Sequence, residues 1–263
     1  MSASSPEAVS TNTLEQWLAA TLQIDQFKDY SPNGLQVAGT PHIRHIVTGV
    51  TASLALIDQA IQQQADALIV HHGWFWKNES PCIRGPKRER VARVLDNNLN
   101  LFGYHLPLDA HPVLGNNAQL ARILSLEPDT DDTGQPVTFG PASLIWSGRC
   151  STQRTLADFA AQTATALDRQ PLVVGDPGKV IKRVAWCTGG AQSMMQDAID
   201  QGVDLYITGE ASEQNFHMAN ESGVAFMAAG HHATERYGPK ALGDAIAQQF
   251  GVSVTFIDLD NPI

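Results

Sequence analysis

The sequence alternates between short apolar runs and longer segments whose apolar residues recur with helical spacing, and this rhythm continues along most of its 263 residues. The apolar runs have the length of buried strands, and the segments between them are long enough to form helices. The runs lie at 43–50, 65–72, 99–105, 143–148, 182–188, 203–209, 224–230 and 252–258. This alternation predicts an α/β fold with mixed sheets covered by helices, because several connections are too short for parallel crossovers.

An acidic segment at 126–140 interrupts the rhythm with Pro, Gly and no periodicity. We expect a linker there, between a first lobe at 1–125 and a second lobe at 141–263, with the last strand free to return to the first lobe. Residues 43–70 align without a gap to residues 181–208, with six identities and the same order of strand, helix and strand. Any two such units share this order, but the identities favour an internal duplication and therefore two related lobes.

The charge balance argues against some classes of partner. The chain has 27 acidic and 17 basic side chains, for a formal net charge of −10. A general binder of nucleic acid or of an anionic membrane needs a basic face, so neither is expected. One basic cluster stands apart, and we interpret it as a solvated helix face rather than a phosphate-binding patch. It comprises Lys77, Arg84, Lys87, Arg88, Arg90 and Arg93.

Cysteine usage and the N-terminus predict the compartment. Cys82, Cys150 and Cys187 have no metal-motif spacing, and an odd number of distant cysteines is typical of free thiols in a reducing environment. The N-terminal residues are polar, and no apolar run is long enough to span a bilayer. We expect a cytoplasmic protein without a membrane partner, whose first eleven or so residues form a flexible tail.

Histidine and acidic side chains lie at the end of four of the predicted strands or just after it, where ligands of α/β folds collect. Imidazoles and carboxylates without cysteine are typical ligands of Zn, Fe or Mn. Taken singly, a His-His pair or a His-x-x-x-Glu pair is more often structural, but their joint occurrence favours a metal site. The ligands outnumber what one ion needs, which favours two ions that share a carboxylate. The residues are His71, His72, His105, Asp109, Glu210, His231 and Glu235.

Several stretches resemble the NIF-three-like dinuclear-metal family, also named GTP cyclohydrolase type-two homologues, in its short bacterial form. The most specific are HHGWFW, HLPLDAHP and GHHATE, and the similarity runs from about residue 30 to the C-terminus. The resemblance implies two divalent ions between the lobes and a toroidal homohexamer. It assigns the metal ligands to His71, His72, Asp109, His231 and Glu235, with Glu235 as the bridging carboxylate.

The resemblance also implies a function. We expect a dinuclear-metal-dependent hydrolase that acts on a nucleotide-like small molecule through a metal-activated water, with Glu210 or His105 moving protons. Glu210 stands where the family often has Asp. The alternative is a non-catalytic, toroidal metal-binding scaffold, associated with nucleic acid. Six chains would carry a charge of about −60, which argues against nucleic acid as a partner.

Overall fold

The computed structural model describes residues 8–263, and the chain divides into two compact units. Unit 1 runs to Leu108 and resumes at Gly238–Asp260, and unit 2 comprises Asp109–Tyr237 and Asn261–Ile263. The chain therefore changes unit inside two helices, α4 (Leu106–Ala110) and α10 (Tyr237–Phe250). This division differs from the predicted linker at 126–140, and it places Asp109 in unit 2 instead of the first lobe.

Unit 1 is built on a five-stranded mixed sheet in the order β14-β4-β5-β6-β2. β14, β4, β5 and β6 run parallel, and β2 is antiparallel to β6. The last strand thus lies in unit 1, and β1 and β3 form a separate pair. Besides α4 and α10, the elements are β1 (Val9–Ser10), α1 (Thr11–Leu22), η1 (Ile24–Gln26), β2 (Gly34–Val37), β3 (His42–Ile43), β4 (His45–Thr51), α2 (Leu54–Gln62), β5 (Ala67–His72), α3 (Pro86–Asp96), β6 (Asn100–Gly103) and β14 (Ser253–Phe256).

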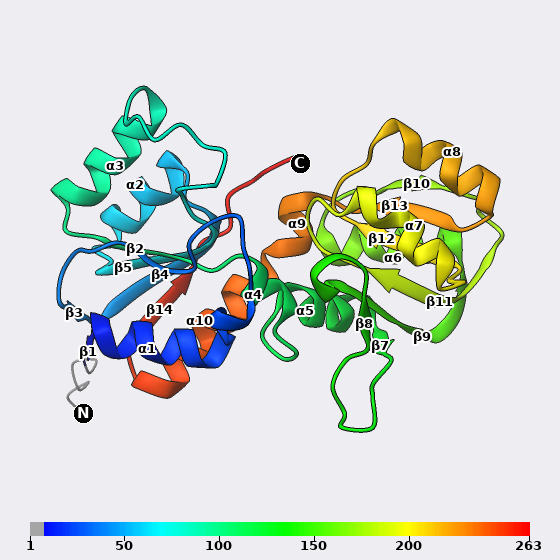
Figure 1. Ribbon diagram of the computed structural model, residues 1–263, viewed down its shortest axis with the longest axis horizontal. Helices are drawn as coiled ribbons and strands as arrows, with labels where there is room; N and C mark the ends of the chain where they lie inside the picture. Colours follow the sequence, from blue (N-terminus) through cyan, green and yellow to red (C-terminus); the bar gives the residue numbers. More distant parts are fainter. Residues whose placement is uncertain (1–7) are drawn as a thin grey trace. The chain divides into compact units, whose positions relative to one another are not determined.

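Helices cover both faces of the unit 1 sheet. Figure 1 shows α2 and α3 on one face and α1 with α10 on the other. On the second face, the rings of Trp17 in α1 and Phe250 in α10 meet edge to face, with centroids 5.5 Å apart. On the first face, the sheet and α2 bury a core that includes Val47, Leu56 and Leu68. A parallel sheet buried on both faces leaves its strand ends as the place where polar groups can gather.

Unit 2 contains a seven-stranded mixed sheet with the order β10-β13-β12-β11-β9-β7, and β8 pairs with β9. β11, β12 and β13 are parallel, whereas β10, β9, β7 and β8 pair antiparallel with their neighbours. The elements are α5 (Asn116–Leu124), β7 (Leu126–Pro128), β8 (Thr138–Phe139), η2 (Pro141–Ser143), β9 (Ile145–Thr155), α6 (Leu156–Leu167), β10 (Leu172–Val174), β11 (Val180–Trp186), η3 (Gln192–Met194), α7 (Met195–Asp200), β12 (Leu205–Thr208), α8 (Glu213–Ser222), β13 (Ala225–Ala228) and α9 (His231–Glu235). The segment predicted as a linker therefore contributes β7 and β8 to this sheet.

Matching hydrogen bonds support the internal duplication. In unit 1, Oδ2 of Asp66 accepts from the backbone N–H groups of Arg44 and His45, at 2.7 and 3.0 Å. In unit 2, the aligned Asp204 accepts in the same way from the backbone N–H groups at positions 182 and 183, both at 2.9 Å. Gln64 and the aligned Gly202 both adopt positive φ, 55° and 64°. The aligned strands of the two units thus begin with the same hydrogen bonds, and the aligned helices are followed by the same backbone conformation.

The structure corrects two further expectations. The segment at 233–250, between the last two apolar runs, has the spacing of a single helix, but it forms parts of two, α9 and α10. The reason is that Pro239 has no N–H to donate to the carbonyl of Glu235, where α9 ends. The predicted N-terminal tail is too long, because Val9 already lies in β1, and residues 1–7 fall outside the described part of the chain. No helix within residues 8–263 combines the length and apolar composition needed to cross a membrane.

Candidate metal centre

Three imidazoles of unit 1 lie together where β5 and β6 end. His71 and His72 are the last residues of β5, and His105 follows β6 in the loop before α4. Each ring offers a nitrogen within 4.8 Å of the nitrogens offered by the other two. His71 is fully buried, and Nδ1 of His72 lies 3.3 Å from Oγ1 of Thr51 at the end of β4. Parallel pairing of β5 with β6 is what brings these residues to one edge of the sheet.

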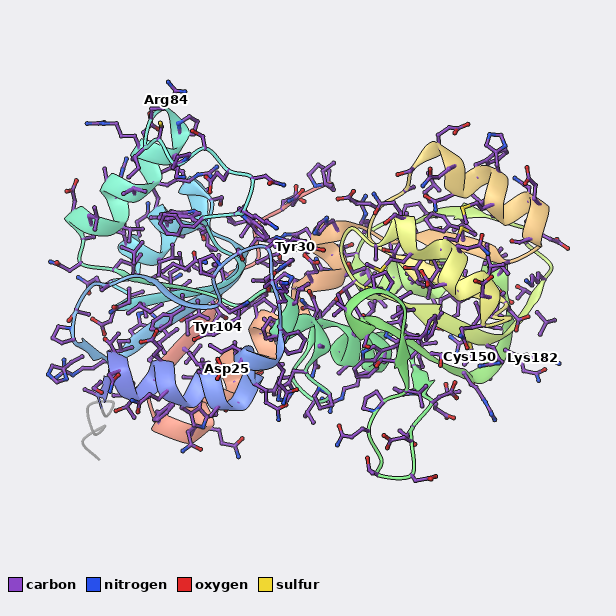
Figure 2. All side chains as sticks on the ribbon, in the orientation of Figure 1. Asp25, Tyr30, Arg84, Tyr104, Cys150 and Lys182 are labelled. Atoms are coloured by element: carbon purple, nitrogen blue, oxygen red, sulfur yellow. The ribbon has the colours of Figure 1, made fainter. Side chains whose placement is uncertain are left out.

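Hydrogen bonds fix the orientation of two of these rings. Nδ1 of His71 lies 2.9 Å from the backbone carbonyl oxygen of Tyr104, whose side chain is buried inside unit 1 (Figure 2). Nδ1 of His105 lies 2.7 Å from Oδ1 of Asp29. A carbonyl or carboxylate oxygen can only accept, so each Nδ1 donates and the neutral ring carries its lone pair on Nε2. This is the arrangement in which protein histidines bind metals.

Asp29 belongs to a loop that is hydrogen-bonded to the first residue of α4. Its Oδ2 accepts from Nδ2 of Asn33 and from the backbone N–H of Leu106, both at 2.9 Å. Burial by itself raises the pKa of this carboxyl, but the hydrogen bond and charge of His105 outweigh it, helped by the Asn33 and Leu106 donors, and lower the pKa to about 2. Asp29 is therefore ionised throughout the physiological range.

The Asp29→Asn substitution is expected to lower the free energy of unfolding by about 2 kcal/mol at neutral pH, because the pKa of the Asp29 carboxyl falls from 3.8 to about 2 on folding. A carboxyl whose pKa is lower in the folded state stabilises the fold at any pH above its unfolded-state pKa. This stabilisation is lost as the pH falls through the folded-state pKa. The gap between wild type and variant should therefore narrow between pH 3.8 and about 2. Urea unfolding at neutral and acid pH measures it, and a gap that stays constant would contradict this account.

The aromatic residues after the His pair divide into three roles. Trp74 is buried in the unit 1 core, whereas Phe75 is 40% exposed. The ring of Trp76 meets His105 edge to face, with centroids 4.9 Å apart, and lies 6.0 Å from the ring of His72. Of the three, Trp76 is the one that flanks the imidazoles.

Unit 2 brings two buried carboxylates toward one thiol. Asp109 is 6% and Glu235 is 3% exposed. Oδ1 of Asp109 accepts from Nδ2 of Asn116 at 2.9 Å and from Oγ1 of Thr188 at 3.2 Å. Burial raises the pKa of the Cys187 thiol well above its usual value, and the charges of Asp109 and Glu235 raise it further. Both carboxylates therefore act on the same interior region of unit 2, and Cys187 stays a thiol.

His231 links Glu235 to Glu210. Nδ1 of His231 lies 2.6 Å from Oε1 of Glu210, and Nε2 lies 3.2 Å from Oε2 of Glu235. Oε2 of Glu210 accepts from Nε2 of Gln192 at 3.3 Å. Burial alone lowers the pKa of His231, but the hydrogen bonds and charges of the two glutamates outweigh it and raise the pKa to about 9. In the metal-free protein a positive charge thus sits where Nε2 faces Glu235.

Gly189 makes room for this pair. It follows β11 with φ of +68°, and a Cβ at this position would overlap Oε1 of Glu235 and lie 3.1 Å from Nε2 of His231. Its backbone N–H donates to Oγ1 of Thr234 in α9, at 3.1 Å. The glycine pair in CTGGAQS therefore serves the close approach of Glu235 to the backbone.

These residues fit divalent metal ions by the chemistry of their donors. Unit 1 offers the imidazoles of His71 and His72, with His105 beside them, and unit 2 offers buried carboxylates beside an imidazole whose Nδ1 is held by Glu210. Buried anions that lie together are costly unless a cation or a proton compensates them. In the metal-free protein the proton on His231 supplies part of this compensation, and a metal ion at Nε2 would displace it.

The sequence reasoning missed most of the residues that hold the candidate ligands. Asp29, Thr51, Asn116 and Thr188 lie in loops or at element ends, where no hydrophobic period marks them. The one available signal was the turn sequence SPNG, which contains Asn33 of the Asp29 loop. Glu210, whose role was open, lies against His231.

The basic cluster is partly neutralised within unit 1. Lys87 pairs with Glu79 at 3.2 Å, and Arg93 pairs with Asp58 at 3.1 Å. Arg84 is exposed in the loop before α3 (Figure 2). These ion pairs favour the interpretation of a solvated helix face over that of a phosphate-binding patch.

Known proteins resemble this chain over nearly its whole length. A family model described as Duf34/NIF3 (NGG1p interacting factor 3) matches residues 9–262. A "GTP cyclohydrolase 1 type 2 homolog" of Neisseria meningitidis serogroup B is 54% identical over 246 residues, which are 94% of this chain and 96% of the relative. A protein of the same name from Pseudomonas aeruginosa is 49% identical over 255 residues, 97% and 99% of the two chains.

Two solved structures also resemble this chain. Protein ybgI, described as of unknown function, is 48% identical with a TM-score of 0.91, covering 97% of this chain and all of its own. TTHA1606 from Thermus thermophilus is 32% identical with a TM-score of 0.84, at the same coverage. The family resemblance expected from the motifs is confirmed, and the chain belongs to the Duf34/NIF3 (NGG1p interacting factor 3) family.

Proposed function

We propose that this protein is a divalent-metal-dependent hydrolase that uses water to cleave a nucleotide-like small molecule. The proposed ligands of two ions are His71 and His72 from unit 1 with Asp109, His231 and Glu235 from unit 2, and Glu235 bridges. The observation that carries the proposal is that Nδ1 of His71 and Nδ1 of His231 each lie against a protein oxygen, as the second ring nitrogen of a metal-binding histidine does. Zn, Fe and Mn all suit such a set.

The bound ions would supply Lewis acidity and lower the pKa of a coordinated water. The protein's own residues supply the rest. Glu210 holds the ring of His231 through Nδ1, and Asn116 and Thr188 hold Oδ1 of Asp109. These partners fix each side chain before substrate arrives, so little reorganisation is needed during the reaction.

The names of the relatives make GTP the first substrate to test. Metal-loaded protein is expected to open the guanine imidazole ring by hydrolysis and release formate, and the His71→Ala and Glu235→Ala variants should be slower by about 100-fold or more. The Glu213→Gln variant is the control, because Glu213 is an exposed carboxylate on α8. Equal turnover by wild type and ligand variants would exclude metal from the mechanism, whereas cleavage of phosphoesters but not GTP would retain the hydrolase and change its substrate.

We also propose that six copies assemble into a ring. The support for the ring is the family membership alone. A hexamer of 28.4 kDa chains has a mass of about 170 kDa, six times that of one chain. Analytical ultracentrifugation at micromolar concentration measures this, and a monomer or dimer there would refute the ring.

A further inference from the structure

We infer that Asp29 and His105 form a proton-transfer pair, in which Asp29 is a positioning residue that keeps the proton of the His105 ring on Nδ1 and its lone pair on Nε2. The inference rests on the proposed hydrolase function and adds to it the group that accepts a proton from the attacking water. Neither residue is among the five proposed metal ligands.

The loop that carries Asp29 is built to hold His105 from several sides. Oδ1 of Asp29 lies 2.7 Å from Nδ1 of His105, and the same atom accepts from the backbone N–H of Tyr30 at 2.6 Å. Oδ1 of Asn33 accepts from the backbone N–H of His105 at 2.7 Å, and Nδ2 of Asn33 donates back to Asp29. Ring and backbone of His105 are therefore fixed by two side chains that also bind each other.

Asp29 is well suited to this task because it is shielded from water. Its side chain is 3% exposed and that of His105 is 15% exposed. A charge-assisted hydrogen bond in such surroundings is stronger than one at the surface, so it imposes a single tautomer. The rings of Trp76 and His105 pack edge to face, which limits the rotation of the imidazole.

The tautomer determines what His105 can do. With Nδ1–H donated to Asp29, Nε2 is the basic atom, and the His105 ring lies 5.2 Å from that of His71 and 5.8 Å from that of His72. During hydrolysis Nε2 takes a proton from the attacking water as its oxygen bonds to the substrate. The O–H bond breaks, its electron pair stays on the oxygen, and the ring becomes an imidazolium paired with the Asp29 carboxylate. The same proton then passes from Nε2 to the leaving group, which restores the neutral ring.

The tautomer can be measured without any substrate. Nitrogen-15 NMR of the full zinc-loaded chain, labelled at histidine and recorded at mildly alkaline pH, separates the two tautomers, and the His105→Gln variant assigns the signal. We expect the Nδ1–H form in wild type and a shift toward the Nε2–H form in Asp29→Asn. A wild-type ring in the Nε2–H form would overturn the inference, whatever the protein hydrolyses.

Kinetics on GTP test the role itself. His105→Gln should lower kcat by about 10² to 10⁴-fold with little change in KM and an unchanged zinc content, and Asp29→Asn should lower kcat less. His217→Gln is the matched control, because His217 bonds Glu213 at the same 2.7 Å but on the exposed face of α8. Loss of zinc from His105→Gln would make His105 a ligand and overturn the inference, as would an unchanged kcat. If wild type leaves GTP intact, the proposed substrate fails, and the NMR result still decides the positioning by Asp29.

Discussion

Glu235→Gln is expected to weaken divalent-metal binding by more than about 100-fold, because the substitution removes the negative charge of the proposed bridging ligand and keeps its size. Glu235 is 3% exposed, and its Oε2 lies 3.2 Å from Nε2 of His231. A neutral amide oxygen at this buried position is a weaker metal ligand than a carboxylate oxygen. Competition with a fluorescent zinc chelator measures the affinity. Wild type should also gain thermal stability when zinc is added, and the variant should not.

Glu213→Gln is the control for the same chemical change on a solvent-exposed helix, and it should bind zinc as wild type does. Equal zinc affinities of wild type and Glu235→Gln would remove Glu235 from the ligand set. A loss of affinity in Glu213→Gln as well would point to general electrostatics instead of coordination.

Gly189→Ala should destabilise the protein by about 3 kcal/mol or more, and it should impair metal binding as well. Part of the cost is the positive φ of +68°, worth about 1 to 2 kcal/mol for a residue with a Cβ. The remainder arises because the new Cβ overlaps Oε1 of Glu235, which must then move within a buried environment. Urea unfolding and a zinc titration measure the two effects.

Gly202→Ala separates these contributions. Gly202 has nearly the same backbone conformation, with φ of +64°, but nothing lies within 4 Å of its Cβ position. Its counterpart in unit 1, Gln64, shows that this conformation accepts a side chain. We expect a cost of about 1 kcal/mol with normal zinc binding. Equal costs for the two alanine variants would mean that the approach of Glu235 to Gly189 does not matter for stability.

The sequence predicts the parallel core of each unit better than its edges. The strands β4, β5, β11 and β12 overlap the predicted apolar runs at 43–50, 65–72, 182–188 and 203–209, which stand next to amphipathic helices. The edge strands β2 and β10 lie outside those runs, so no hydrophobic pattern predicts them. The division into units was predicted at a change of composition, but the chain crosses between units inside α4 and α10, where composition does not change.

The sequence likewise predicts some residues of the candidate site and not others. His71 and His231 could be selected because the first lies at the end of a predicted strand and the second directly after one, and the ends of parallel strands share one edge. Asp29 and Thr188 could not, because each acts through a hydrogen bond to a residue 76 or 79 positions away, and such pairings depend on the tertiary fold. The role of Gly189 was hidden for the same reason, since a glycine pair in a sequence does not reveal which side chain approaches it.

The central claim is that imidazoles and carboxylates of this chain hold two divalent ions. Elemental analysis of the purified full-length protein, combined with X-ray absorption at the edge of the metal found, tests it most directly. We expect two ions per chain whose nearest neighbours are nitrogen and oxygen, with the more distant scattering of imidazole rings and no sulfur, because no cysteine is a proposed ligand. Protein that holds no metal after incubation with zinc, iron or manganese, or metal bound through sulfur, would contradict the account.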